Sequence, residues 1–187
     1  MSNSNYTLTG VTSSDKSKTL SITAATITYT NTSPVSEYCT ATAAATTKTL
    51  GSVSISIASA SATDYSGTAI TSGSNPSVEG YTISQSGWSI SSDGKTITVP
   101  ANVDAGTYNI TVTAAKPNHT SKTNGISVTL TAVELSTLTL TPHTNTIPYG
   151  GTTEVDRVKA TYSNGAWKDV KDDATYTTNP TGIITIS

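Results

Sequence analysis

Few side chains in this chain could do chemistry, and they are scattered along it. The densest acidic group is Asp169, Asp172 and Asp173, whose carboxylate oxygens are of the kind that calcium prefers. Lys168 and Lys171 alternate with these acids and would neutralise their field, which favours a solvated turn over a metal site. Glycosidase chemistry needs two carboxyl groups that flank a cleft, and nothing in the sequence indicates such a pair.

The histidines and the cysteine are too widely spaced to predict a metal centre. His119 and His143 lie in polar segments and are expected to be solvated loop residues, whereas zinc needs three or four converging ligands. Cys39 is the only cysteine and is expected to be a small buried side chain, with a reactive thiol or an intermolecular bridge as the alternatives. Serine is abundant enough to complete a Ser-His-Asp triad, but no nucleophile-elbow motif supports one. We therefore expect no enzyme activity, no cofactor and no metal.

The two tryptophans are the side chains most suited to binding a ligand, because an exposed indole can stack on a sugar ring. Trp88 shares its parity with Ile90, which predicts a side chain in the core. Trp167 follows an Asn-Gly turn and precedes Lys168, so exposure is as well supported as burial. If Trp167 is exposed, it is the candidate glycan contact.

The segments that would position these residues follow a two-residue period. In residues 107–114, Tyr108, Ile110, Val112 and Ala114 fall on one face and polar groups on the other, as in a half-buried β-strand. The same alternation recurs in residues 50–58 and 126–132, and Asp-Gly and Asn-Gly pairs supply hairpin turns. Residues 59–76 are expected to be a loop, and residues 31–49 have no clear pattern. With no convincing helical period, the chain is predicted to be all-β, and its long loops favour a sandwich over a barrel.

Composition narrows the class of protein further. A length of 187 residues suits one large or two small domains, and a hydrophobic fraction of 34% predicts a thin core. The net charge is −2 and there is no basic run, which argues against nucleic-acid binding. No apolar segment is long enough for a transmembrane helix, so membrane insertion is not expected.

The N-terminal residues bear on the expected location. Residues 1–17 lack the apolar core of a signal peptide. If Met1 is the natural start, this fits a virion component that is assembled in the cytoplasm and later exposed; removal of a signal would explain it equally. We expect residues 1–17 to be a polar arm, residues 18–133 a sandwich and residues 134–187 a second unit, because the parity of the apolar positions switches near residue 133.

Residues 134–187 carry a family likeness. The order Leu-Thr-Leu-Thr-Pro, Pro-Tyr-Gly-Gly-Thr-Thr, Val-Lys-Ala-Thr-Tyr-Ser-Asn-Gly, Ala-Thr-Tyr and Ile-Ile-Thr-Ile-Ser resembles bacterial immunoglobulin-like domains of the intimin and invasin type, which also occur in phage structural proteins. Residues 78–133 resemble such a repeat more weakly, and residues 1–77 more weakly still. The likeness implies tandem immunoglobulin-like β-sandwiches and says little about function.

The second unit departs from that family at its end. The family's Ile-Thr-Ile strand is followed by a turn and about two further strands, whereas this chain stops at Ser187. The chain is then part of a longer protein, or a neighbouring chain supplies the missing strand by β-augmentation, or the second unit is small and loosely ordered. The second sandwich is accordingly expected to be incomplete on its own.

These observations predict a non-enzymatic structural or display module. The leading expectation is a phage virion protein at the virion surface: a capsid decoration, head-fibre or tail-associated protein whose Thr- and Ser-rich faces make weak multivalent contacts with glycans. Its expected partners are other structural subunits, and it is expected to be oligomeric. The alternative is an extracellular bacterial protein, either a cell-surface adhesin or a filament subunit. A third hypothesis is an accessory carbohydrate-binding domain of an enzyme.

Overall fold

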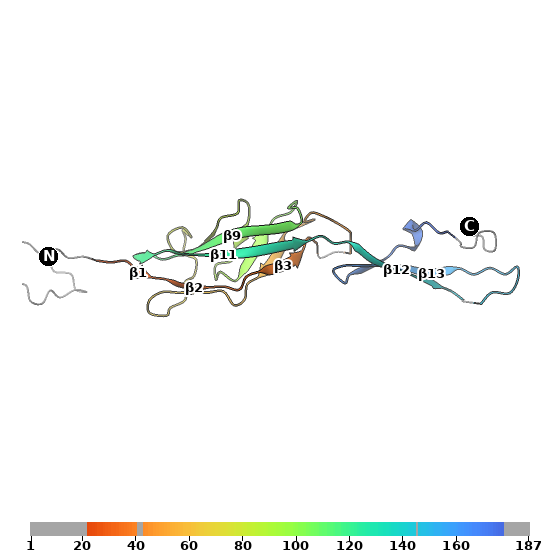
Figure 1. The fold of residues 1–187 in the computed structure, drawn as a ribbon, viewed down its shortest axis with the longest axis horizontal. Coiled ribbons are helices and arrows are strands. Elements are labelled where there is room, and N and C mark those ends of the chain that lie inside the picture. The colour runs from red at the N-terminus through yellow and green to blue at the C-terminus, as the bar shows by residue number, and fades with distance from the viewer. Residues whose placement is uncertain (1–21, 41–42, 145, 178–187) are drawn as a thin grey trace, which may run out of the picture.

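The computed structural model describes residues 22–40, 43–144 and 146–177. Fourteen strands and one short 3-10 helix, η1 (Lys171–Asp173), make up its regular structure in these ranges. The molecule is elongated, with β1 (Ala25–Thr26) near one end and the strands β12 (Leu135–Pro142) and β13 (Val155–Tyr162) at the other (Figure 1). The all-β prediction is therefore confirmed. The predicted arm at 1–17 and the C-terminal Ile-Ile-Thr-Ile-Ser motif lie outside the described residues.

A four-stranded sheet forms one layer of the central body. Its order is β3 (Val35–Tyr38), β11 (Lys122–Thr131), β9 (Gly106–Ala115) and β6 (Gly80–Ile83). The two long strands β9 and β11 run antiparallel, with Ile110 opposite Ile126, and β6 pairs antiparallel with β9. The edge strand β3 runs parallel to β11, with Val35 opposite Val128.

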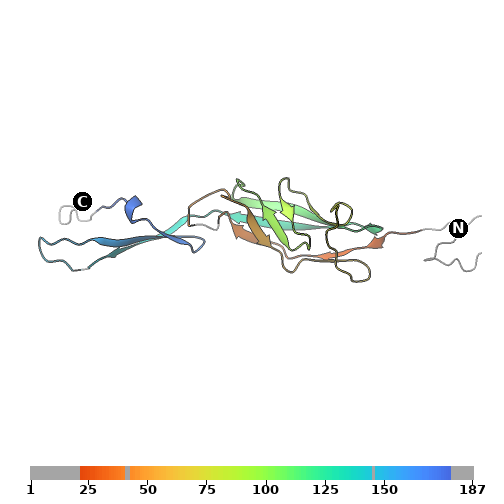
Figure 2. The ribbon, with the colours of Figure 1, turned by 180° about the vertical axis from the view of Figure 1, so that it is seen from behind.

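A three-stranded sheet and two short strand pairs complete the body. The sheet has the order β4 (Val53–Ser56), β8 (Thr96–Val99) and β7 (Ser89–Ile90). Strand β2 (Thr28–Thr30) pairs with β5 (Ser61–Thr63), and β1 pairs with β10 (His119–Thr120). Figure 2 shows the central layers from behind.

The core lies between these layers and follows the predicted alternation. In β9 the side chains of Ile110, Val112 and Ala114 are buried, whereas Asn109 and Thr111 are exposed. One connected apolar cluster joins the inward side chains of both sheets, among them Ile55, Ile57, Ile97, Val99, Ile126, Val128 and Leu130. Hydrophobic burial at every second position therefore stabilises the sandwich.

Trp88 belongs to this core, as its parity predicted. Its side chain is only 7% exposed, and its ring lies 5.2 Å from that of Tyr108. Cys39 is also fully buried, in agreement with the expected small buried side chain. Burial raises the pKa of the Cys39 thiol, which keeps the sulfur in its neutral, unreactive form.

A separate three-stranded sheet follows the sandwich. It has the order β12 (Leu135–Pro142), β13 (Val155–Tyr162) and β14 (Trp167–Asp169), all antiparallel. The predicted Asn-Gly turn joins β13 to β14, with Gly165 at a φ of +80°, a conformation that suits glycine. The change of sheet falls between β11 and β12, where the sequence places a domain boundary. The tandem immunoglobulin-like description of the two units stays a prediction.

Candidate functional site

The candidate site lies on one face of the C-terminal sheet, around Trp167. Because side chains alternate along a strand, β13 presents Arg157, Lys159 and Thr161 on this face and Val158 and Ala160 on the other. Thr161 is the register partner of Trp167. Val158 and Ala160 are buried, whereas their register partners on β12, Leu140 and Leu138, are more than half exposed. The tryptophan lies on the opposite, polar face, which is called the outer face below.

Trp167 is exposed because it lies on an edge strand. β14 has β13 on one side and no described strand on the other, and the Trp167 side chain is 52% exposed. The sequence left its exposure open, and the structure places it at the surface. Two cations lie over the indole: Arg157 Cζ is 5.8 Å from the ring centroid and Lys159 Nζ is 5.3 Å from it. Both distances are within the range of cation–π attraction.

The acids of the neighbouring turn have local partners. Asp169 Oδ1 accepts hydrogen bonds from the backbone N–H groups of Val158, at 3.3 Å, and Lys171, at 3.1 Å. Asp173 pairs with Lys168 at 3.2 Å. In the part of the chain that the structure describes, no three His, Cys, Asp or Glu side chains converge as metal ligands. The acidic segment therefore forms a turn that ends the sheet, in keeping with its sequence pattern.

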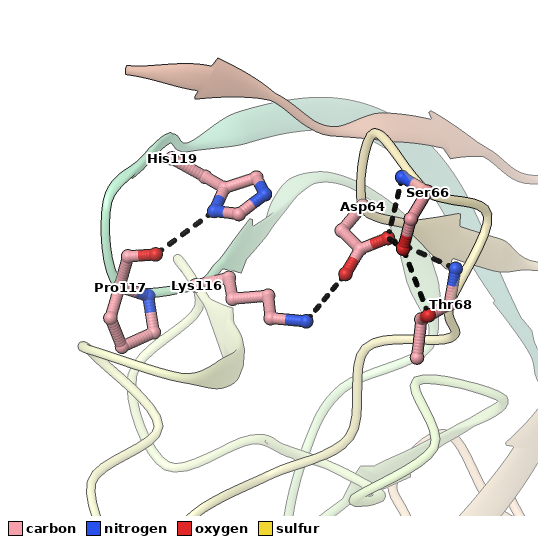
Figure 3. A network of polar contacts seen from close by, with 6 residues as sticks. All are labelled: Asp64, Ser66, Thr68, Lys116, Pro117 and His119. Carbon is pink, nitrogen blue, oxygen red and sulfur yellow. Dashed lines mark hydrogen bonds and ion pairs between the residues drawn. The ribbon is translucent and has the colours of Figure 1, made fainter. Parts of the chain in front are cut away.

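A second polar cluster, Asp64 with Lys116, fastens a loop to the sandwich (Figure 3). Asp64 follows β5, is 8% exposed, and its Oδ2 lies 2.6 Å from Lys116 Nζ at the end of β9. Its Oδ1 accepts hydrogen bonds from the N–H and Oγ–H of Ser66 and from the N–H of Thr68. The Lys116 ammonium and then the Ser66 hydroxyl lower the pKa of Asp64 well below its usual range, and Asp64 raises the pKa of Lys116. Both groups are therefore held in their charged forms.

Sequence reasoning missed this ion pair, although part of its signal was present. Asp followed two residues later by Ser, and then by Gly, is a turn pattern in which the carboxylate accepts backbone N–H groups. The partner Lys116 is 52 residues away in sequence, so only the fold brings it to Asp64.

The two histidines lie in different surroundings. His119 belongs to β10 and is half-buried, so the expectation of a solvated loop residue was wrong for it; its ring stacks on Tyr65 at 5.8 Å, and its Nδ1–H donates to the Pro117 carbonyl at 2.9 Å. His143 is exposed as expected, 3.1 Å from Asp156.

Hydrogen bonds fix the joint between the sandwich and the C-terminal sheet. Thr46 and Val133 exchange two backbone hydrogen bonds of 2.8 and 3.0 Å across the start of the connection. The β13–β14 turn packs against the end of β3, where Tyr38 Oη donates to the Ser163 carbonyl at 2.7 Å and Asn164 Nδ2 donates to the Thr40 carbonyl at 3.4 Å.

The connection itself is also held. Ser163 N–H donates to the Glu134 carbonyl at 2.8 Å, and Glu134 N–H donates to Ser163 Oγ at 3.0 Å. Of the three residues between β11 and β12, Ala132 and Glu134 thus bond to Ser163, about thirty positions away in sequence, and Val133 bonds to Thr46. These contacts limit hinge motion at the joint.

Comparisons with family models, with curated proteins and with solved structures gave no match to this chain. Among the described residues, no helix is long and apolar enough to cross a membrane.

Proposed function

We propose that this chain is a non-enzymatic structural and display module, and that its setting is the surface of a phage virion. The observation that carries the proposal is the hydrogen-bonded joint between two β units in an elongated molecule. Hydrogen bonds from this connection to Thr46 and to Ser163 resist bending between the two units. A Gly- or Ser-rich linker would instead leave the units free to reorient. A stiff arm can hold a face away from the surface to which its other end is attached.

The exposed faces suit weak, repeated contacts. The outward positions of β9 and β12 are mainly threonine, which offers hydroxyl groups but no charge. Single contacts of this kind are weak, and many copies on one particle raise the overall affinity through effective concentration. The immunoglobulin-like resemblance supports the virion setting, because such domains occur in phage structural proteins.

Immunogold electron microscopy of particles purified from the source organism tests this function. An antibody raised against the chain is expected to label the outside of assembled virions, at a regular position. Labelling of no particle, with the protein recovered only in the particle-free fraction, would remove the virion proposal. Pre-absorption of the antibody with purified chain provides the control.

A subunit of an extracellular bacterial filament or adhesin is the second candidate, and the C-terminal sheet favours it. Leu138 and Leu140 on β12 are 59% and 51% exposed, and β12 and β14 are both edge strands in the described part of this sheet. An exposed edge beside apolar side chains is a surface on which another chain can pair. Label on cell-attached fibres, with export genes beside the coding sequence, would select this candidate over the virion.

A further inference from the structure

We propose that Arg157, Lys159 and Trp167 form a binding site for an acidic saccharide, that is, a sugar ring bearing a carboxylate or sulfate group. The proposal rests on the proposed display function and gives the displayed face a ligand class. It begins from the geometry of the outer face of the C-terminal sheet, where both cations lie over an indole that is 52% exposed.

The two cations have no acidic partner in the described part of the chain. The ion pairs found there involve Lys48, Lys116, His143 and Lys168, and include neither Arg157 nor Lys159. The one acid on the same face, Asp169, is the register partner of Lys159 and uses Oδ1 for two backbone N–H groups. In a chain with a net charge of −2, this face therefore carries two cations against one acid.

An anionic group on a sugar would satisfy these cations. Arg157 can donate two parallel N–H bonds to a carboxylate or sulfate, and Lys159 can act beside it as a point charge. The indole provides an apolar platform next to the cations, against which a sugar ring can pack. Charged groups thus bind the substituent while the aromatic ring binds the body of the ligand.

The same face offers hydroxyl groups for the remainder of a saccharide. Thr137, Thr139 and Thr141 are exposed on β12 and are the register partners of Thr161, Lys159 and Arg157. Register partners in an antiparallel sheet project to the same side, so a row of threonines runs beside the cations. Sugar hydroxyls can exchange hydrogen bonds with this row.

The arrangement disfavours two other ligands. A neutral sugar could pack against the indole in the same way, but it would gain nothing from the charge of the two cations. A nucleic-acid backbone needs several clustered cations to displace its counterions, and this face provides two. An acidic saccharide uses both features at once.

Isothermal titration calorimetry of the full chain tests the site. The probes are sialyllactose, a sulfated chondroitin oligosaccharide, neutral lactose and inorganic sulfate. We expect binding of at least one acidic saccharide that weakens as salt is raised, with no measurable binding of lactose and weaker binding of sulfate alone. If lactose binds as well as the acidic sugars, or if no saccharide binds, the proposal is wrong.

Variants locate the binding. Combined Arg157→Gln and Lys159→Gln is expected to weaken acidic-sugar binding about tenfold or more, because it removes both charge-assisted contacts to the anionic group. Trp167→Ala should weaken acidic-sugar binding further, and Trp167→Phe, which keeps an aromatic ring, should retain part of that binding. Lys122→Gln, which removes an exposed cation on the sandwich, is the matched control and should change nothing. Unchanged binding in the Arg157/Lys159 variant would overturn the assignment.

Circular dichroism confirms that each variant is folded. The outcome is separable from that of the proposed function: sugar binding without particle labelling removes the virion setting and keeps the site. Particle labelling with no sugar binding removes the site and keeps the module.

Discussion

Replacing Ile110 by Ala tests whether burial at alternate positions holds the sandwich together. Ile110 lies in the middle of β9, is 2% exposed and faces the core cluster. The substitution removes three carbon atoms, worth about 0.8 kcal/mol each in transfer free energy, and leaves a cavity that adds to the loss. We expect the free energy of unfolding to fall by about 2–5 kcal/mol, with Ile110→Val costing about 0.5–1.5 kcal/mol.

The matched control is Thr111→Ala, one residue along the same strand. Thr111 is exposed, so its loss should change the free energy of unfolding by about 0.5 kcal/mol or less. Urea unfolding is followed by the fluorescence of the buried Trp88 in a Trp167→Phe background. Equal destabilisation by Ile110→Ala and Thr111→Ala would refute the alternation argument, because the two side chains would then be equivalent.

Three further predictions concern the loops and the cysteine. The lowered pKa of Asp64 means that its ion pair with Lys116 stabilises the fold at pH values above the ordinary aspartate pKa of about 4, and that this stabilisation is lost as pH falls through the lower folded-state pKa. Asp64→Asn should therefore make the free energy of unfolding fall less steeply as the pH is lowered. An unchanged acid dependence would exclude the ion pair as its cause. Gly94→Ala should lower the melting temperature, because Gly94 has a φ of +73° and an added Cβ would lie 2.6 Å from the Tyr81 ring; an unchanged melting temperature would contradict the turn geometry. Cys39 should react slowly with a thiol reagent in the native protein and fully in denaturant, and rapid native labelling would show that it is not buried.

The strands of the central body were predictable where the alternation is long. Residues 107–114 and 126–132 alternate over seven or more positions, and they form most of β9 and the C-terminal half of β11. Their burial is local information, since the two-residue period determines which side chains face the core.

The short strands could not be predicted in the same way. Strand β3 lies in a segment with no clear pattern, and it exists because it pairs in parallel with β11, more than ninety positions later. Residues 59–76 were predicted to be a loop, yet they contain β5, whose Ala62 is buried. Strands of three or four residues carry too few alternating positions to be recognised, and their partners are distant.

The candidate site was predictable only in part. The Asn-Gly turn predicted the hairpin that carries Trp167, and the residue itself was named as a glycan contact. Its exposure depends on β14 being an edge strand, which sequence does not determine. The cations over the ring come from β13 and reach Trp167 through the antiparallel register, so they too follow from the fold.

The stiffness of the joint is most directly tested by residual dipolar couplings of the backbone N–H groups. The couplings of residues 53–131 and of residues 135–170, which flank the joint, are expected to fit a single alignment tensor. Tyr38→Phe removes the 2.7 Å hydrogen bond to Ser163 and should loosen this agreement. If the two groups in the unmodified chain require tensors of different magnitude, the units reorient independently and the molecule is not a stiff arm.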